Sequence, residues 1–132
     1  MSPAAHLLAA SLILISLAGP ASNFLLATLA AVTLALIPAG DARSLSAFLQ
    51  PLLVTALFVN VYLGVFNLIP FPPLDGSKVL STFLPPGFQP IFDMLEQYGF
   101  LILMLLVYMG VIGLVMYPFY VFVEYLLYTR WF

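Results

Sequence analysis

The stretch Phe66-Asn-Leu-Ile-Pro-Phe-Pro-Pro-Leu-Asp-Gly-Ser-Lys-Val79 interrupts a sequence that is otherwise almost continuously apolar. It places prolines, a glycine and the carboxylate of Asp75 beside segments long enough to cross a membrane. At membrane depth an unwound backbone persists only where protein buries it or where it lines a polar cavity. An ionisable residue in such a place is costly, which favours a function for it. Asp75 is therefore our first candidate site residue.

The composition is that of an integral membrane protein. Of the 132 residues, 64% are hydrophobic and only 6% are charged, and the mean hydropathy of +1.19 exceeds that of ordinary soluble domains. The three basic residues are too few and too scattered to form a nucleic-acid surface, so we expect no nucleic acid partner. Because there is no cysteine, any metal site must use histidine and carboxylates.

The apolar segments predict an all-α, polytopic membrane protein with three or four spans and an unwound, proline-rich loop that ends in Leu-Asp-Gly. Residues 7–37 exceed one span, so we expect Gly19-Pro20 to kink or divide a helix there. A polar break at residues 38–43 precedes a second apolar helix over residues 44–69. We treat residues 1–132 as a single membrane domain that crosses a lipid bilayer, with the cell membrane as its expected location.

The second half of the chain leaves two questions open. The prolines at 70–73 predict extended backbone up to Asp75, because each fixes its own φ and restricts the residue before it. Asp75 then precedes a short amphipathic helix over residues 76–84, and a capping role is as well supported as a functional one. Another apolar helix is expected over residues 91–109. Residues 110–118 are compatible with a helical hairpin or with a kink.

Amide and small side chains mark a helix face in the second apolar segment. Asn60, Gly64 and Asn67 fall at i, i+4 and i+7, so they share one side of a helix. Because unpaired amides are costly in hydrocarbon, we expect Asn60, Gly64 and also Asn23 to contact neighbouring helices rather than lipid. Helix packing and a role at a site are both compatible with this pattern.

We consider two short motifs of the chain as a pair. The first is Gly19-Pro-Ala-Ser-Asn23, and the second is Asn67-x-x-Pro-x-Pro-Pro-Leu-Asp-Gly76. Together they closely resemble the paired signatures of the site-2 protease family, which are intramembrane zinc metallopeptidases. The likeness runs from about Leu17 through Tyr98-Gly-Phe100, and it is nearest to the compact bacterial and archaeal branch. The resemblance implies that Asp75 is a zinc ligand and that Asn23 lies near the catalytic site, where it helps to hold substrate or to stabilise an oxyanion.

The same family carries an H-E-x-x-H helix, whose two histidines complete the zinc site and whose glutamate activates the bound water. This sequence has one histidine, His6, which is followed by Leu7 and has Ala10 where the second histidine would stand. Catalytic zinc normally takes three protein ligands. We therefore do not expect the chain alone to hold zinc, and we expect the missing helix to lie in an upstream segment or to have been lost.

Three functions follow from these observations. The leading hypothesis is an intramembrane zinc metalloprotease that hydrolyses peptide bonds of a membrane-protein substrate, with this chain supplying Asp75 and scaffold. In that hypothesis an extended substrate pairs with the unwound backbone of residues 69–74. The alternative is a non-catalytic module that binds membrane partners and has kept the scaffold without the zinc. A small transporter subunit is a third candidate, since broken helices with a carboxylate also form ion sites, but no repeat or second broken helix accompanies it.

Overall fold

The computed structural model describes residues 2–38, 40 and 43–131, so part of the polar break expected at residues 38–43 lies outside the described residues. The described residues form helices and short connections, with no strand among them. In chain order these are α1 (Pro3–Leu36), α2 (Leu45–Leu68), α3 (Asp75–Phe83), the short 3-10 helix η1 (Pro86–Phe88), α4 (Gln89–Tyr108) and α5 (Val111–Trp131). Four helical stretches are long and apolar enough to cross a membrane. The all-α membrane architecture expected from the sequence is confirmed.

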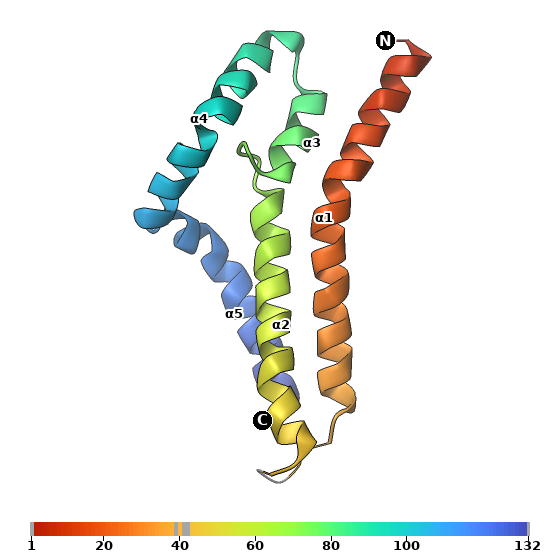
Figure 1. Ribbon diagram of the computed structural model, residues 1–132, viewed down its shortest axis with the longest axis vertical. Coiled ribbons are helices and arrows are strands. Elements are labelled where there is room, and N and C mark those ends of the chain that lie inside the picture. Colours follow the sequence, from red (N-terminus) through yellow and green to blue (C-terminus); the bar gives the residue numbers. More distant parts are fainter. Residues whose placement is uncertain (1, 39, 41–42, 132) are drawn as a thin grey trace.

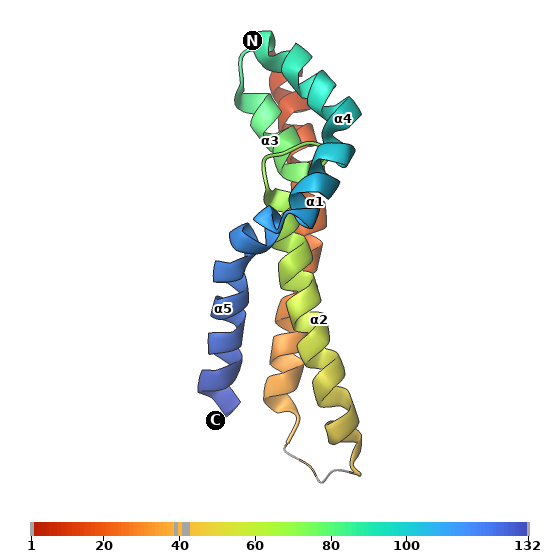
Figure 2. The same cartoon turned by 90° about the vertical axis from the view of Figure 1, so that its left-hand side faces the viewer.

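Helices α1 and α2 lie side by side along the length of the molecule and run in opposite directions (Figures 1 and 2). Helix α3 continues from the end of α2 and packs on the amino-terminal half of α1. Helix α4 lies beside the half of the molecule that carries α3, and α5 lies beside the opposite half (Figure 2). The loop between α2 and α3 extends toward α4, on the side of α3 that faces away from α1 (Figure 1).

Helix α1 is one continuous helix, although it contains a proline. Its start is capped by Ser2, whose side chain accepts a hydrogen bond from the Ala5 amide at 3.2 Å. Pro20 has no N–H, so the carbonyl of Ser16 lacks its usual donor four residues on. The amino-terminal part of α1 leans away from the line of the remainder (Figure 1). The expected break at Gly19-Pro20 is thus a bend within one helix and not a division into two.

The contact between α1 and α2 depends on a small residue. A Cβ added to Gly64 would lie 2.8 Å from Cε1 of Phe24, so the glycine lets the phenyl ring lie against the backbone of α2. This confirms the expected helix contact of Gly64. Asn60 is half-buried, but its amide donates to the Ala56 carbonyl of its own helix at 2.8 Å, and Asn23 is half-buried as well.

Two apolar clusters hold the helices together. Below the Phe24 contact, α1, α2 and α5 share a cluster of buried residues, Ala27, Ala30, Leu34, Leu57 and Val123. Nearer the loop, a second cluster joins the loop to α4 and α5 through Leu74, Leu103, Ile112 and Met116. Burying each large apolar side chain against protein contributes packing contacts that lipid tails supply less well. The loop is therefore part of the packed interior and not an exposed connection.

The loop itself is a series of tight turns, so the expectation of extended backbone is wrong. The Phe71 amide donates to the Ile69 carbonyl at 2.8 Å, and the Leu74 amide donates to the Phe71 carbonyl at 2.9 Å. The peptide bond between Pro72 and Pro73 is cis. Prolines restrict φ but not the pairing of the remaining amides, and in an apolar environment those amides bond within the loop.

The structure also decides between cap and site residue at the start of α3. Helix α3 begins at Asp75, its cap residue is Leu74, and no side chain caps it. Asp75 therefore lies one position inside the helix, which excludes the capping role considered for it. A carboxylate in the first turn is still favoured by the helix dipole.

Helices α4 and α5 meet at Gly110, which has φ +79. That left-handed conformation suits glycine and ends α4. In both views α5 continues toward the far end of the molecule at an angle to α4, and it does not fold back along it (Figures 1 and 2). The question left open at residues 110–118 is thus resolved as a sharp turn between two helices, with Pro118 inside α5.

Gly76 provides a test of this fold. An added Cβ would lie 2.6 Å from the Ile69 carbonyl oxygen and closer still to that of Leu68, both backbone atoms that cannot rotate away. We expect Gly76→Ala to destabilise the protein by about 3 kcal/mol, because overpacking against backbone forces the chain to shift. Gly113 is the matched control, because apart from its chain neighbours and the adjacent backbone of its own helix nothing lies within 4 Å of its added Cβ. Gly113→Ala should be neutral or slightly stabilising in the same unfolding titration in detergent, and equal effects at both positions would contradict the packing described here.

Candidate functional site

The carboxylate of Asp75 lies between α3 and α1. Its side chain is 29% exposed. A Cβ added to Gly19 would lie 3.2 Å from Oδ2 of Asp75, so the carboxylate lies directly against the backbone of α1. The two sequence motifs, which are far apart in the chain, therefore meet at this carboxylate. The fold brings them together because α3 packs on the half of α1 that contains Gly19-Pro20.

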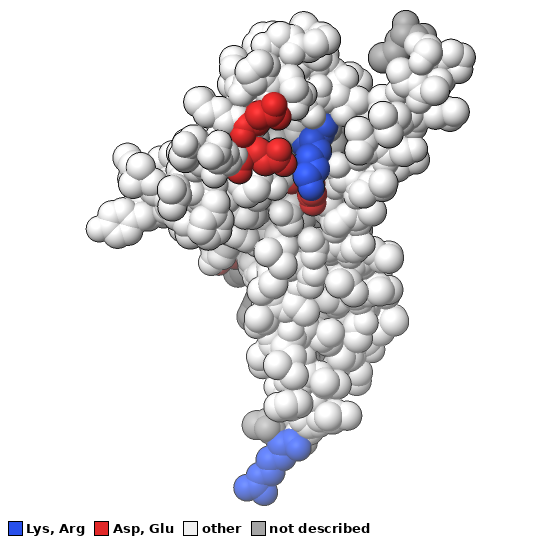
Figure 3. Space-filling model, turned by 45° about the horizontal axis from the view of Figure 1, so that its top comes forward, with Lys and Arg blue, Asp and Glu red and all other residues white. Residues whose placement is uncertain are grey.

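Lys78 is the polar partner of Asp75 that the structure records. Its Nζ lies 3.4 Å from Oδ1 of Asp75, one turn further along α3, and the lysine side chain is 55% exposed. Such an exposed pair contributes only about 0–1 kcal/mol. Acidic and basic side chains gather at the end of the molecule built by α3 and α4, whereas most of the visible surface below them is uncharged (Figure 3). The lysine is therefore a weak partner that leaves the carboxylate available.

Asn23 lies on α1 one turn after Gly19, on the same face of the helix and about 6 Å along its axis. Its side chain is half-buried and makes no hydrogen bond to another described residue. Asn67, near the end of α2, is half-buried as well. The structure records no hydrogen bond between either amide and Asp75, so Asn23 stays a prediction as a site residue.

A three-ligand metal site is not formed by the described residues. Among them, no group of three histidine, aspartate or glutamate side chains lies close enough to hold an ion. His6 is exposed near the start of α1, and the 13 residues from it to Gly19 span roughly 20 Å of helix. His6 and Asp75 therefore cannot share a metal ion. The residues present offer one carboxylate, and by themselves they do not fit catalytic zinc.

The loop cannot pair with an extended substrate in the way the sequence suggested. Three of the residues 69–74 are prolines without an N–H. The amides of the other three, Ile69, Phe71 and Leu74, donate to carbonyls of Phe66, Ile69 and Phe71. Strand addition needs free donors as well as acceptors on the receiving backbone. The expected backbone pairing is therefore wrong for this conformation, because the loop has already used its donors.

One residue of the site region was not recognised from the sequence. Gly99 of α4 is buried, and a Cβ added there would lie 2.5 Å from the carbonyl oxygen of Pro72. The sequence contains two signals for it: the family likeness extends to Tyr98-Gly-Phe100, and a glycine interrupts an apolar helix. Such a glycine costs about 1 kcal/mol relative to alanine unless packing requires it. The loop is thus contacted by α4 on one side while Asp75 contacts α1.

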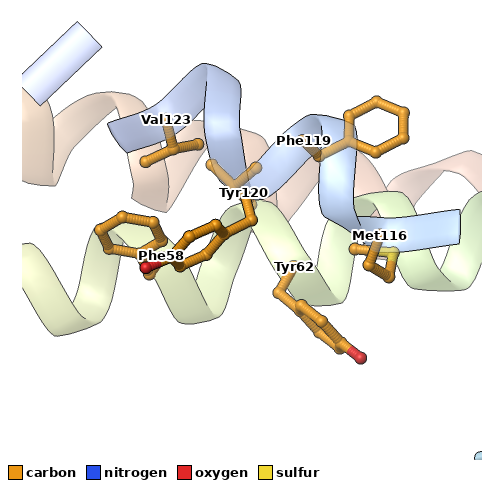
Figure 4. Close-up of a pocket in the computed structure, with 7 residues that line it drawn as sticks. Phe58, Tyr62, Met116, Phe119, Tyr120 and Val123 are labelled. Atoms are coloured by element: carbon orange, nitrogen blue, oxygen red, sulfur yellow. The ribbon is translucent and has the colours of Figure 1, made fainter. Parts of the chain in front are cut away.

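Two cavities among the described residues are lined by side chains that offer no acid–base or metal-binding chemistry. A small one, about 20 Å³, lies between α2 and α5, where Phe58 and Tyr120 approach with ring centroids 5.4 Å apart (Figure 4). A larger one, about 430 Å³, lies between α1, α2 and α5 and is lined by apolar side chains alone. Neither is lined by Asp75 or by another acidic or basic residue.

Comparison with known proteins places these features in a family. Residues 35–107 match the sequence model of peptidase family M50. The chain is 36% identical over 97 residues to "Putative zinc metalloprotease YwhC" of Bacillus subtilis (strain 168), an overlap that covers 71% of this chain and 44% of that protein. It is 42% identical over 96 residues to "Putative zinc metalloprotease Rip2" of Mycolicibacterium smegmatis (strain ATCC 700084 / mc(2)155), covering 70% of this chain and 34% of that protein. No solved structure shows a significant match.

The chain spans less than half the length of these two relatives. The family match nevertheless covers more than half of the 132 residues, and it includes α2, the loop, Asp75 and Gly99. Gly19-Pro20 and Asn23 precede the matched residues. The resemblance to site-2 proteases is confirmed, and this chain belongs to peptidase family M50.

Proposed function

We propose that this chain forms part of an intramembrane zinc metalloprotease that hydrolyses peptide bonds of membrane-protein substrates in the cell membrane. The observation that supports it most is the position of the Asp75 carboxylate, half-buried against Gly19 of the other motif. Membership of family M50 and the names of both relatives, which include the words zinc metalloprotease, support the reaction class. Four apolar helical stretches long enough to cross a membrane support a membrane-embedded protease.

In this proposal Asp75 is one zinc ligand. A carboxylate oxygen suits that role, and its exposed contact with Lys78 is weak enough to be given up. Zinc in a complete site of this kind polarises the scissile carbonyl and activates a water. The other ligands would come from residues that these 132 do not contain, since His6 is far along α1 and no other histidine is present.

Asn23 has the second role in the proposal. Its amide lies one turn from Gly19, so it is on the face of α1 that Asp75 contacts. An amide without a hydrogen bond to another described residue can donate to a substrate carbonyl as charge develops on it. We assign Asn23 to substrate binding or oxyanion stabilisation rather than to metal binding.

The role of Asp75 can be tested in a chimaera in which this chain replaces the matched 97 residues of the Bacillus subtilis relative. We expect the chimaera to bind about one zinc per polypeptide and to cleave a membrane-embedded peptide substrate. Asp75→Ala and Asp75→Asn should each weaken zinc binding by at least about 100-fold, more than changes to residues outside the ligand set usually do. Both properties are measured, zinc by elemental analysis after competition with a chelator and cleavage by product formation.

Asp93→Asn is the matched control, because Asp93 is an exposed acid of α4 that accepts a hydrogen bond from Gln89 at 2.9 Å. It should leave zinc content and cleavage unchanged. Wild-type zinc affinity in Asp75→Asn would rule out Asp75 as a ligand. Equal losses of zinc affinity from Asp75→Asn and Asp93→Asn would show that zinc binding depends on the number of acidic residues and not on the position of Asp75.

Substitutions of Asn23 and of Asp75 should have different effects on the same chimaera. We expect Asn23→Ala to keep its zinc and to lose about 100- to 1,000-fold in kcat, the usual effect of removing one oxyanion donor. The measurement is a full kcat and KM determination with zinc content checked in the same preparation. Loss of zinc in Asn23→Ala, or unchanged kcat, would refute the assignment.

A non-catalytic membrane module is the second candidate function. The observation in its favour is the single histidine, which α1 holds far from Asp75. On this account the chain would bind membrane partners through its apolar helices and would hold no zinc in any assembly. Failure of the chimaera to bind zinc, with intact folding and with zinc bound by the unmodified relative, would favour it over the protease.

A further inference from the structure

The contact between α4 and the loop is unusually close. Gly99 is buried, and an added Cβ would lie 2.5 Å from the carbonyl oxygen and 3.0 Å from the carbonyl carbon of Pro72, with Cδ of Pro73 at 3.6 Å. Two of these atoms are backbone, so they cannot rotate away as the end of a side chain can. Any side chain at position 99 would therefore displace either α4 or the loop.

The opposite side of the same loop is held by α1. Asp75 follows Pro72 by three residues, and its Oδ2 would lie 3.2 Å from a Cβ on Gly19. That contact is also tighter than ordinary van der Waals separation. The loop and the first turn of α3 thus lie between two helix backbones, with Gly19 at one contact and Gly99 at the other.

Side chains around Gly99 reinforce its contact. Leu103, one turn further along α4, is buried in the cluster that includes Leu74, the residue directly before Asp75. The loop residue Phe71 packs against the same cluster. A shift of α4 would therefore move the residue that immediately precedes the carboxylate.

We propose that Gly99 is a positioning residue for Asp75: the lack of a side chain lets α4 lie against the Pro72 carbonyl, and this contact sets the separation between the Asp75 carboxylate and α1. Gly99 touches neither Asp75 nor Gly19 and acts through the loop. The consequence for catalysis rests on the proposed function, whereas the positioning itself does not.

A disulfide between α1 and α3 measures this separation directly. Because the chain has no cysteine, Gly19→Cys combined with Asp75→Cys introduces a single possible pair. Oδ2 of Asp75, which is two bonds beyond the Asp75 Cβ, lies 3.2 Å from a Cβ added to Gly19. A disulfide requires Cβ atoms about 3.5–4.5 Å apart, so disulfide formation by this pair is sensitive to the separation of the two backbones. The rate of disulfide formation under mild oxidant, in membranes, reports the separation without any need for enzymatic activity.

We expect this rate to fall at least about fivefold when Gly99→Ala is added, because disulfide formation tolerates little displacement. Gly99→Val should lower it further. Gly113→Ala, at a glycine with open space around it, should leave the rate within about twofold. An unchanged rate in Gly99→Ala, an equal fall in Gly113→Ala, or no disulfide in the parent pair would each overturn the proposal.

Two further variants separate positioning from general loss of stability. Leu103→Ala withdraws a buried side chain beside the loop without adding bulk, and Leu57→Ala does the same in the other apolar cluster. We expect Leu103→Ala to lower the rate of disulfide formation and Leu57→Ala to leave this rate unchanged, even if both variants lower the melting temperature. If Gly99→Ala does not accumulate, the two leucine variants still test whether α4 positions the loop. Equal effects of both on the disulfide rate would refute that role of α4.

The outcomes for position and for catalysis are independent. If Asp75→Asn leaves zinc and cleavage intact in the chimaera, the proposed function fails whatever the disulfide shows. If neither Gly99→Ala nor Leu103→Ala changes the rate of disulfide formation, the positioning role fails even where Asp75 proves to be a zinc ligand.

Discussion

The structure depends on how an unwound loop survives among membrane-length helices. Within a bilayer every backbone N–H needs a partner inside the protein. Residues 69–74 meet this demand in two ways: three prolines have no N–H, and the other three amides donate to nearby carbonyls. The loop can therefore leave the helical path without an unpaired donor, and Asp75 is placed at its end instead of inside a long helix.

Close backbone contacts then hold this loop in place. Gly76 packs against the last carbonyls of α2, Gly99 against the Pro72 carbonyl, and Gly19 against the Asp75 carboxylate. Without a strong hydrophobic force between helices in lipid, such close approach is a main source of cohesion. The glycines thus determine where the carboxylate lies relative to α1 and α4, and they connect the fold to the proposed site.

The same arrangement explains why the single carboxylate of Asp75 is a candidate site residue. Asp75 is half-buried, has a weak exposed partner in Lys78, and lies against a helix whose next turn carries the amide of Asn23. A carboxylate with so weak a partner is available to interact with another group. Membership of family M50 is consistent with zinc as that group, and among the described residues no three histidine, aspartate or glutamate side chains are close enough to hold an ion by themselves.

The amino-acid sequence by itself determined the helical class, the approximate spans and the candidate carboxylate, because apolar length and a proline-rich interruption are local properties. It did not determine that the loop is turned rather than extended, that Leu74 and not Asp75 occupies the cap position of α3, or that α5 turns away at Gly110. Prolines limit φ, but which carbonyl each remaining amide selects depends on the surrounding packing. Only the tertiary structure decided that Gly19 and Gly99 lie on either side of the Asp75 loop, since the approach of two backbones from distant segments leaves no local pattern beyond the glycines themselves.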